Sequence, residues 1–142
     1  MSKSNIAENE ALSMFLNGVN PSYGGNLYLA LHVSDPGEDG NQNTSEVSLT
    51  DYPTYSRVAI PRDNTGVSGF TTSGNPRSNI AQVQFQTCVG GNAIQITHFS
   101  LGELANGAGK IIYSGSLSAG GILVANNTTP LIAPGALLIS ED

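Results

Sequence analysis

The sequence predicts an all-β protein, a single jelly-roll-like antiparallel β-sandwich spanning residues 1–142 with one short N-terminal α-helix. Glycine (17 residues) and proline (7 residues), with serine, threonine and asparagine, make up nearly half of the chain, which is typical of proteins rich in turns. Apolar residues still account for 39%, enough for one core, whereas charged residues account for only 11%. Strand-like segments follow one another about every 10–16 residues, without helical periodicity between them.

The predicted helix runs from Asn5 to Asn17. Apolar side chains recur along one side of it at helical spacing: Ile6, Ala7, Ala11, Met14 and Phe15. Ser4 or Asn5 can cap its first turn, and Gly18 can end it in the left-handed conformation. The Asn20-Pro21 step prevents the helix from continuing.

The segment Leu27–Val33 carries large side chains on both faces, which predicts a central strand of a two-layer structure. The further predicted strands are Ser56–Ile60, Val67–Thr71, Ile80–Gln86, Ala93–Leu101, Lys110–Leu117, Ile122–Ala125 and Ala136–Ser140. Strict alternation within Ala93–Leu101 places Ile96 and His98 on one face and Phe99 on the other. Turn-forming residues separate these segments.

Charge and hydropathy exclude two classes of partner. The formal net charge is −6, whereas a nucleic-acid-binding protein needs a basic stripe to neutralise phosphates. The sequence has no apolar run of the roughly 18–20 residues that span a bilayer. The first ten residues lack an apolar stretch of the signal-peptide type, so we expect no Sec export. Cys88, the single cysteine, is expected to be a small buried side chain.

The acidic, glycine-rich loop of residues 34–46 allows two interpretations. Compared with a calcium-binding EF-hand loop, Asp35, Asp39, Gly40, Asn43 and Glu46 occupy positions one, five, six, nine and twelve. Position three, however, is a glycine without a side-chain oxygen, and the flanking segments are strands. We favour a solvated loop opened by an Asp-Pro-Gly turn, and calcium bound in an irregular geometry remains the alternative.

Residues for catalysis are not evident in the sequence. His32 and His98 lie in apolar strands without a third partner for acid–base work, which favours hydrogen-bonded structural histidines. The sequence contains none of the nucleophile-elbow, phosphate-binding-loop or zinc-protease motifs, and few carboxylates follow Asp63. We therefore expect no enzymatic activity and no cofactor.

The arginines are the residues expected to organise polar contacts. Arg57 and Arg62 lie five residues apart, on opposite faces if the strand between them is extended. One of them can brace the acidic loop through a carboxylate, and the other can face a partner. An ordinary surface ion pair is the simplest interpretation of either.

Several short motifs, in order, are similar to a family of small virion proteins of tailed bacteriophages. The first is Leu27-Tyr-Leu-Ala-Leu-His32, followed by the Gly-rich acidic loop with Ser45-Glu-Val47 and by Tyr55-Ser-Arg-Val-Ala-Ile-Pro-Arg62. Ile96-Thr-His-Phe99 and Ile112-Tyr-Ser-Gly-Ser-Leu117 come later. Tyr52-Pro-Thr-Tyr55 departs from the Gly-Tyr that the family usually has there. The resemblance extends from about residue 27 to the C-terminus.

The resemblance implies a non-enzymatic virion protein, of the capsid decoration (cement) type or the tail-fibre type. We favour a cement protein on the outer surface of the phage head, made in the host cytoplasm and bound to the major capsid protein, because one short helix leaves no length for a fibre shaft. Self-association into dimers or trimers is also open. The residues expected to contact a partner are Phe15, Tyr52, Tyr55, Arg57 and Arg62.

The alternative is a tail-fibre or tail-tip module that binds a host receptor or glycan. That function predicts an exposed pocket with an aromatic platform, supplied by Tyr23, Tyr28 or Tyr113. A low copy number per particle would accompany it.

Overall fold

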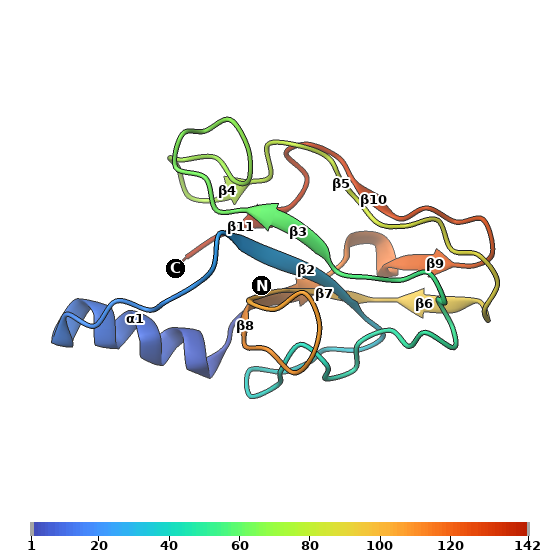
Figure 1. Cartoon of the computed structure of the whole chain (residues 1–142), viewed down its shortest axis with the longest axis horizontal. Helices are drawn as coiled ribbons and strands as arrows, with labels where there is room; N and C mark the ends of the chain where they lie inside the picture. Colours follow the sequence, from blue (N-terminus) through green and yellow to red (C-terminus); the bar gives the residue numbers. More distant parts are fainter. Residues whose placement is uncertain (1, 142) are drawn as a thin grey trace.

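The computed structural model describes residues 2–141 and confirms an all-β fold of antiparallel sheets with a single α-helix near the N-terminus. Its main sheet has five strands in the order β1-β8-β7-β2-β3. Their bounds are β1 Ser2–Lys3, β8 Ile111–Ser116, β7 His98–Gly102, β2 Asn26–His32 and β3 Val58–Pro61. β2 is an interior strand, as predicted, and pairs with β3 and β7 (Figure 1).

The layer facing this sheet consists of three separate two-stranded ladders rather than one continuous sheet. β5 (Val83–Gln84) pairs with β10 (Leu131–Ile132), β6 (Ile94–Ile96) with β9 (Ile122–Val124), and β4 (Arg77–Ser78) with β11 (Leu138–Ile139). A 3-10 turn, η1 (Ser118–Gly120), precedes β9. Because each ladder is short, burial of side chains against the main sheet is what stabilises this layer.

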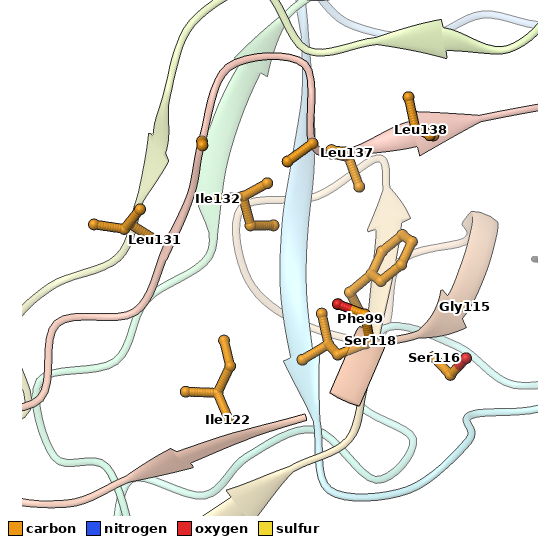
Figure 2. Close-up of a pocket in the computed structure, with 12 residues that line it drawn as sticks. Phe99, Gly115, Ser116, Ser118, Ile122, Leu131, Ile132, Leu137 and Leu138 are labelled. Atoms are coloured by element: carbon orange, nitrogen blue, oxygen red, sulfur yellow. The ribbon is translucent and has the colours of Figure 1, made fainter. Parts of the chain in front are cut away.

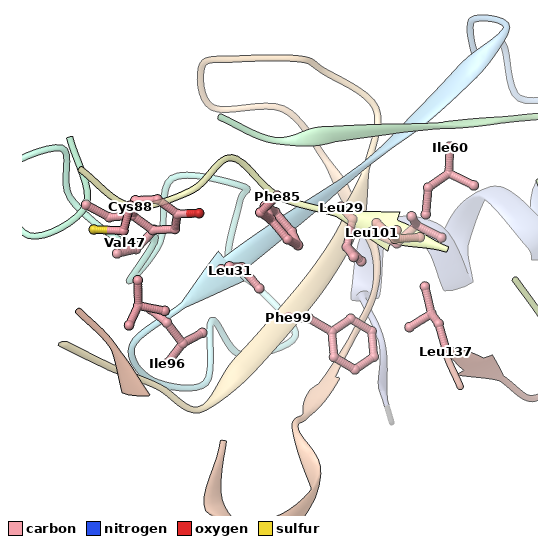
Figure 3. Close-up of a cluster of buried hydrophobic side chains, with 13 residues drawn as sticks. Leu29, Leu31, Val47, Ile60, Phe85, Cys88, Ile96, Phe99, Leu101 and Leu137 are labelled. Atoms are coloured by element: carbon pink, nitrogen blue, oxygen red, sulfur yellow. The ribbon is translucent and has the colours of Figure 1, made fainter. Parts of the chain in front are cut away.

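The hydrophobic core lies between the two layers. Leu29 and Leu31 of β2 and Phe99 and Leu101 of β7 project into it from the main sheet, as expected for alternate residues of adjacent strands. Figure 3 shows them with buried side chains of the opposite layer and its loops. These include Val83, Phe85, Cys88, Ile96, Val124 and Leu137, and Val47 of the connection between β2 and β3 also joins the core.

The chain changes layer at Thr97, and this overturns the predicted single strand over Ala93–Leu101. β6 ends at Ile96 and β7 begins at His98 in the other layer, while the Thr97 hydroxyl donates to the Val33 carbonyl (3.0 Å). The break resets the alternation of faces. Ile96 and Phe99 consequently both point into the core, although strict alternation places them on opposite faces.

Other predicted strands are shorter than expected or absent. Val67–Thr71 forms no strand, because Asp63 and glycines with positive φ at 66 and 69 fold this region into turns. Of Ile80–Gln86 only Val83–Gln84 is extended in a ladder, and of Ala136–Ser140 only Leu138–Ile139. The sequence did not predict the two-residue strands β1 and β10. β1 pairs with β8, and β10 pairs with β5.

Helix α1 (Asn5–Asn17) has the predicted bounds. The Ser4 hydroxyl accepts from the Ala7 amide (3.2 Å), and Gly18 ends the helix with φ 68°. Its first turn lies beside β8, and the rest projects away from the sheets (Figure 1). None of the helical segments in the described part of the chain combines the length and apolar character that crossing a membrane requires.

Candidate functional site

The second half of the acidic loop folds back against the main sheet, whereas Asp35, Glu38 and Asp39 in its first half are exposed. The Gln42 side chain is fully buried, and its amide exchanges two hydrogen bonds with the backbone of Leu104 (2.9 and 3.1 Å). The Thr44 carbonyl accepts from His32 Nδ1 (2.8 Å). The expectation of a plain solvated loop is therefore wrong for the middle of this segment.

Glu46, the last of the possible calcium ligands, is instead bound to Arg57. Arg57 Nε and Nη2 donate to its two carboxylate oxygens at 2.8 and 2.7 Å. Asp35 accepts from the Gly37 amide, and Asp39 accepts from Asn5. Within residues 2–141, no three His, Cys, Asp or Glu side chains come close enough together to hold a metal ion. One arginine thus braces the acidic loop through a carboxylate, as predicted, but the ion pair is buried and not on the surface.

Two of the five predicted contact residues, Tyr52 and Arg57, are buried, and Tyr55 is partly buried. Tyr52 is 0% exposed, and its hydroxyl donates to the Gln86 carbonyl. The Tyr55 hydroxyl donates to Glu46 (2.8 Å), and its ring stacks on Phe85 with centroids 6.1 Å apart. Arg57 is 8% exposed. These side chains join the loop to the core, so we remove them from the proposed contact surface.

Phe15 and Arg62 are exposed, as a contact role requires. Phe15 is 77% exposed on α1. Arg62 follows β3, where Nη1 donates to the carbonyls of Tyr23 and Gly24, both at 3.1 Å, and its guanidinium lies over the Tyr23 ring at 5.4 Å from the centroid.

The exposed apolar surface around Phe15 is larger than the sequence analysis indicated. Of the predicted stripe, Ala7, Ala11 and Met14 turn towards the body of the protein. A second set of apolar residues is more than half exposed: Leu12, Phe15 and Leu16 at i, i+3 and i+4 spacing on α1, and Val19 just beyond the Gly18 cap that ends the helix. We call these four residues the α1 apolar face. The spacing that reveals it is present in the sequence, but several apolar residues in one helix allow two stripes, and only packing shows which is buried.

Both histidines make structural hydrogen bonds, as predicted. Because the Thr44 carbonyl can only accept, the proton of His32 sits on Nδ1, and Nε2 accepts from the Ser100 hydroxyl (2.7 Å). Burial lowers the pKa of His32. His98, its register partner on β7, is hydrogen-bonded to the Thr97 hydroxyl (2.9 Å). Cys88 is buried, also as predicted.

An apolar groove of about 420 Å³ opens between the end of β8 and the strands β9, β10 and β11 (Figure 2). Phe99, Ile122, Leu131, Ile132 and Leu137 supply most of its walls. Its lining contains no titratable side chain, and therefore no group for acid–base chemistry.

A second, polar cleft of about 750 Å³ contains Arg62. It is formed by residues 23–25, 61–64 and 70–72 together with Arg77. Tyr23, one of the three tyrosines predicted for an aromatic platform, lies in it, but its ring is already covered by Arg62 and by Lys110, whose Nζ is 4.9 Å from the centroid. Tyr28 and Tyr113 are not part of this cleft.

Residues 2–140 match the protein family described as "Podophage GP4 fiber I protein gp80". The chain belongs to this family. The resemblance to tailed-phage virion proteins is thereby confirmed, and the match extends through the N-terminal helix as well as the strands. The protein is accordingly a structural protein of the phage virion. No match to the chain is found among curated proteins.

Proposed function

We propose that this member of the gp80 family is a non-enzymatic component of a virion fibre, held in place by protein contacts of the α1 apolar face. The observation that carries the proposal is the family match over residues 2–140, whose description names a fibre protein. The buried ionisable groups support a structural function, because Arg57, Glu46 and His32 are each engaged in bonds that hold loops to the sheet.

The α1 apolar face supports attachment through the helix. Phe15 and the 76% exposed Leu16 belong to the C-terminal half of α1, and Val19 follows the helix. α1 projects from the sheets (Figure 1). Leaving four neighbouring apolar side chains in water is unfavourable, and covering them with a partner removes that cost. We assign the face to another protein of the virion, and association with a second copy is the alternative outcome.

A capsid cement function is the second candidate, favoured by the compact two-layer body and by the 13-residue length of the one α-helix described, which provides no shaft. A cement protein that binds only the assembled lattice of the major capsid protein would stabilise it by mass action. Many copies bridging neighbouring subunits would add avidity.

Copy number distinguishes these two placements. Quantitative mass spectrometry of purified particles should find this protein at far fewer copies than the major capsid protein, because a phage carries few fibres. Copies comparable to those of the major capsid protein would instead support the cement function on the head surface. Detection outside the particle only would contradict both.

The α1 apolar face is tested by Phe15→Asp and Leu16→Asp. Each should reduce incorporation into particles by about tenfold or more, because a buried apolar anchor typically contributes about 2 kcal/mol to an interface. Circular dichroism should show an unchanged fold, since both side chains are exposed.

Val89→Asp is the matched control. Val89 is also an exposed apolar residue, but it lies in the loop between β5 and β6, at the opposite end of the molecule from the tip of α1 (Figure 1). It should leave incorporation unchanged. Wild-type incorporation of both helix variants, or an equal loss in the control, would contradict attachment through this face. Sedimentation of the isolated variants shows whether the face instead joins copies of the chain.

A further inference from the structure

The polar cleft concentrates the cations that are not paired within the protein. The chain has five basic residues at a net charge of −6. Lys3 pairs with Glu141 (2.6 Å), Arg57 with Glu46, and Lys110 with Glu10 (2.6 Å) and Glu103. Among residues 2–141, the two that pair with no carboxylate are Arg62 and Arg77, and both line this cleft.

Each of the two guanidinium groups is held through its own Nη1 atom, which leaves its Nε and Nη2 atoms available. Arg62 uses Nη1 for two backbone carbonyls and is steadied by the Tyr23 ring. Arg77 uses Nη1 for the Thr71 carbonyl at 3.0 Å. The Nε and Nη2 donors of both residues have no acceptor among the described residues, so they can serve a ligand. An anchored guanidinium loses less conformational freedom on binding than a free one.

Asp63, the carboxylate in the same cleft, is committed to its own loop. One oxygen accepts from the amide and hydroxyl of Thr65, and the other accepts from the amide and hydroxyl of Ser68. These hydrogen bonds hold the pKa of Asp63 well below its usual range. Asp63 therefore stays ionised and folds the rim of the cleft, and neither arginine pairs with it.

The remaining lining offers short neutral polar groups. Asn64, Thr71 and Thr72 present amide and hydroxyl groups, and the backbone of Gly24 and Gly25 approaches without side chains. Such groups suit a ligand rich in hydroxyls. Phe70, Pro61 and the Tyr23 ring, which Arg62 already covers, are the main apolar contributions, which is little for the side chains of a docked peptide. The volume is within the usual range of about 300–1,000 Å³ for ligand pockets.

We propose that this cleft binds a saccharide that carries a phosphate or carboxylate group. Arg62 and Arg77 hold the anionic group, since the planar guanidinium matches both anions with paired hydrogen bonds. Asn64, Thr71 and Thr72 bind the sugar hydroxyls. This binding needs only the isolated protein and is independent of where the protein sits on the virion, so its failure and that of the fibre proposal are distinguishable.

Heteronuclear NMR titration of the isolated protein tests the proposal. Glucose 6-phosphate and glucuronate are the probes, with glucose, inorganic phosphate and a short polyglutamate peptide as comparisons. One or both charged sugars should produce saturable shifts at the amides of residues 23–25, 62–64 and 70–72. A charged sugar that produces such shifts should bind at least tenfold more tightly than glucose and more tightly than phosphate alone, because both halves of the ligand are contacted.

Arg77→Gln should weaken binding of the charged sugar about tenfold, the usual effect of losing a hydrogen bond to a charged group. Arg62→Lys keeps the positive charge but loses the paired N–H donors of the guanidinium group. It should also weaken binding of the charged sugar. Lys3→Gln removes the same charge outside the cleft and should have no effect.

Four results would overturn the proposal. The first is no saturable shift with either charged sugar, and the second is equal binding of glucose or of phosphate alone. The third is an equal loss of affinity in Lys3→Gln, which would indicate general charge attraction. The fourth is tighter binding of polyglutamate, which would assign the cleft to an acidic protein partner.

Discussion

Arg57 shows at the scale of one residue why a basic side chain can be part of a core. Its Nη1 donates to the Leu104 carbonyl (3.0 Å), and its Nη2 donates to Asn43 (3.0 Å) and to the Gly107 carbonyl (2.9 Å), in addition to the bonds with Glu46. One guanidinium therefore joins the acidic loop, β3 and the loop before β8. Its donors are satisfied, which is the condition for burying a charge.

Arg57→Met should lower the free energy of unfolding by about 3–5 kcal/mol, because it leaves the Glu46 carboxylate buried without its partner. Adding Glu46→Gln to Arg57→Met should recover part of the loss, since the unpaired charge is then gone. Urea unfolding measures both effects. Lys3→Gln, which breaks the more exposed pair with Glu141, should change stability little. A loss for Arg57→Met no larger than that of Lys3→Gln would refute this account.

At the scale of elements, the acidic loop packs against the sheet where the Gln42 side chain contacts two glycines. Gln42 lies against Gly102 at the end of β7 and against Gly109 just before β8. A Cβ at either glycine would overlap the Gln42 side chain. Because that side chain is buried and bonded to Leu104 at both ends of its amide, it cannot move aside at low cost.

Gly102→Ala should therefore destabilise the protein by about 1–3 kcal/mol, the usual range for overpacking a core. Gly24→Ala is the matched control, because a Cβ there meets nothing within 4 Å. Combining Gly102→Ala with Gln42→Ala should cost less than the sum of the two single changes, since truncating the Gln42 side chain removes the atoms that the added Cβ would overlap. Strict additivity of the three unfolding free energies would argue against the fit.

At the scale of the whole molecule, stability should decrease as the pH falls. Burial lowers the pKa of His32, so the folded protein stays unprotonated there while the unfolded chain binds a proton below about pH 6.5. The stabilisation from neutral His32 is complete above that pH and is lost below it. Asp63 acts in the same direction at lower pH. Its hydrogen bonds with Thr65 and Ser68 lower its pKa, and that contribution is lost below about pH 3.9.

Unfolding by urea at a series of pH values from 8 to 4 measures this dependence. The His32→Gln variant, though less stable at pH 8, should show a flatter decline between about pH 7 and 5 than the natural chain. An unchanged slope in that interval would mean that His32 is not the group responsible.

Local chemistry in the sequence determined α1, the interior strand β2 and the all-β class. Ser4, the spacing of apolar residues and Gly18 act within a few residues of one another, so the helix bounds could be predicted directly. The large side chains of 27–33 likewise indicated burial on both faces. The bracing of the acidic loop by an arginine and the structural histidines were also foreseen from residue type.

Tertiary structure decided the layer change at Thr97, the burial of Tyr52 and Arg57, and the placement of Arg62 and Arg77 in the lining of one cleft. Each depends on which distant segments become neighbours, and the alternation of faces is lost wherever a strand leaves one layer for another. A tyrosine or an arginine suits an interface or a core equally well by its chemistry. Only the carboxylates, carbonyls and rings brought next to it by folding decide between them.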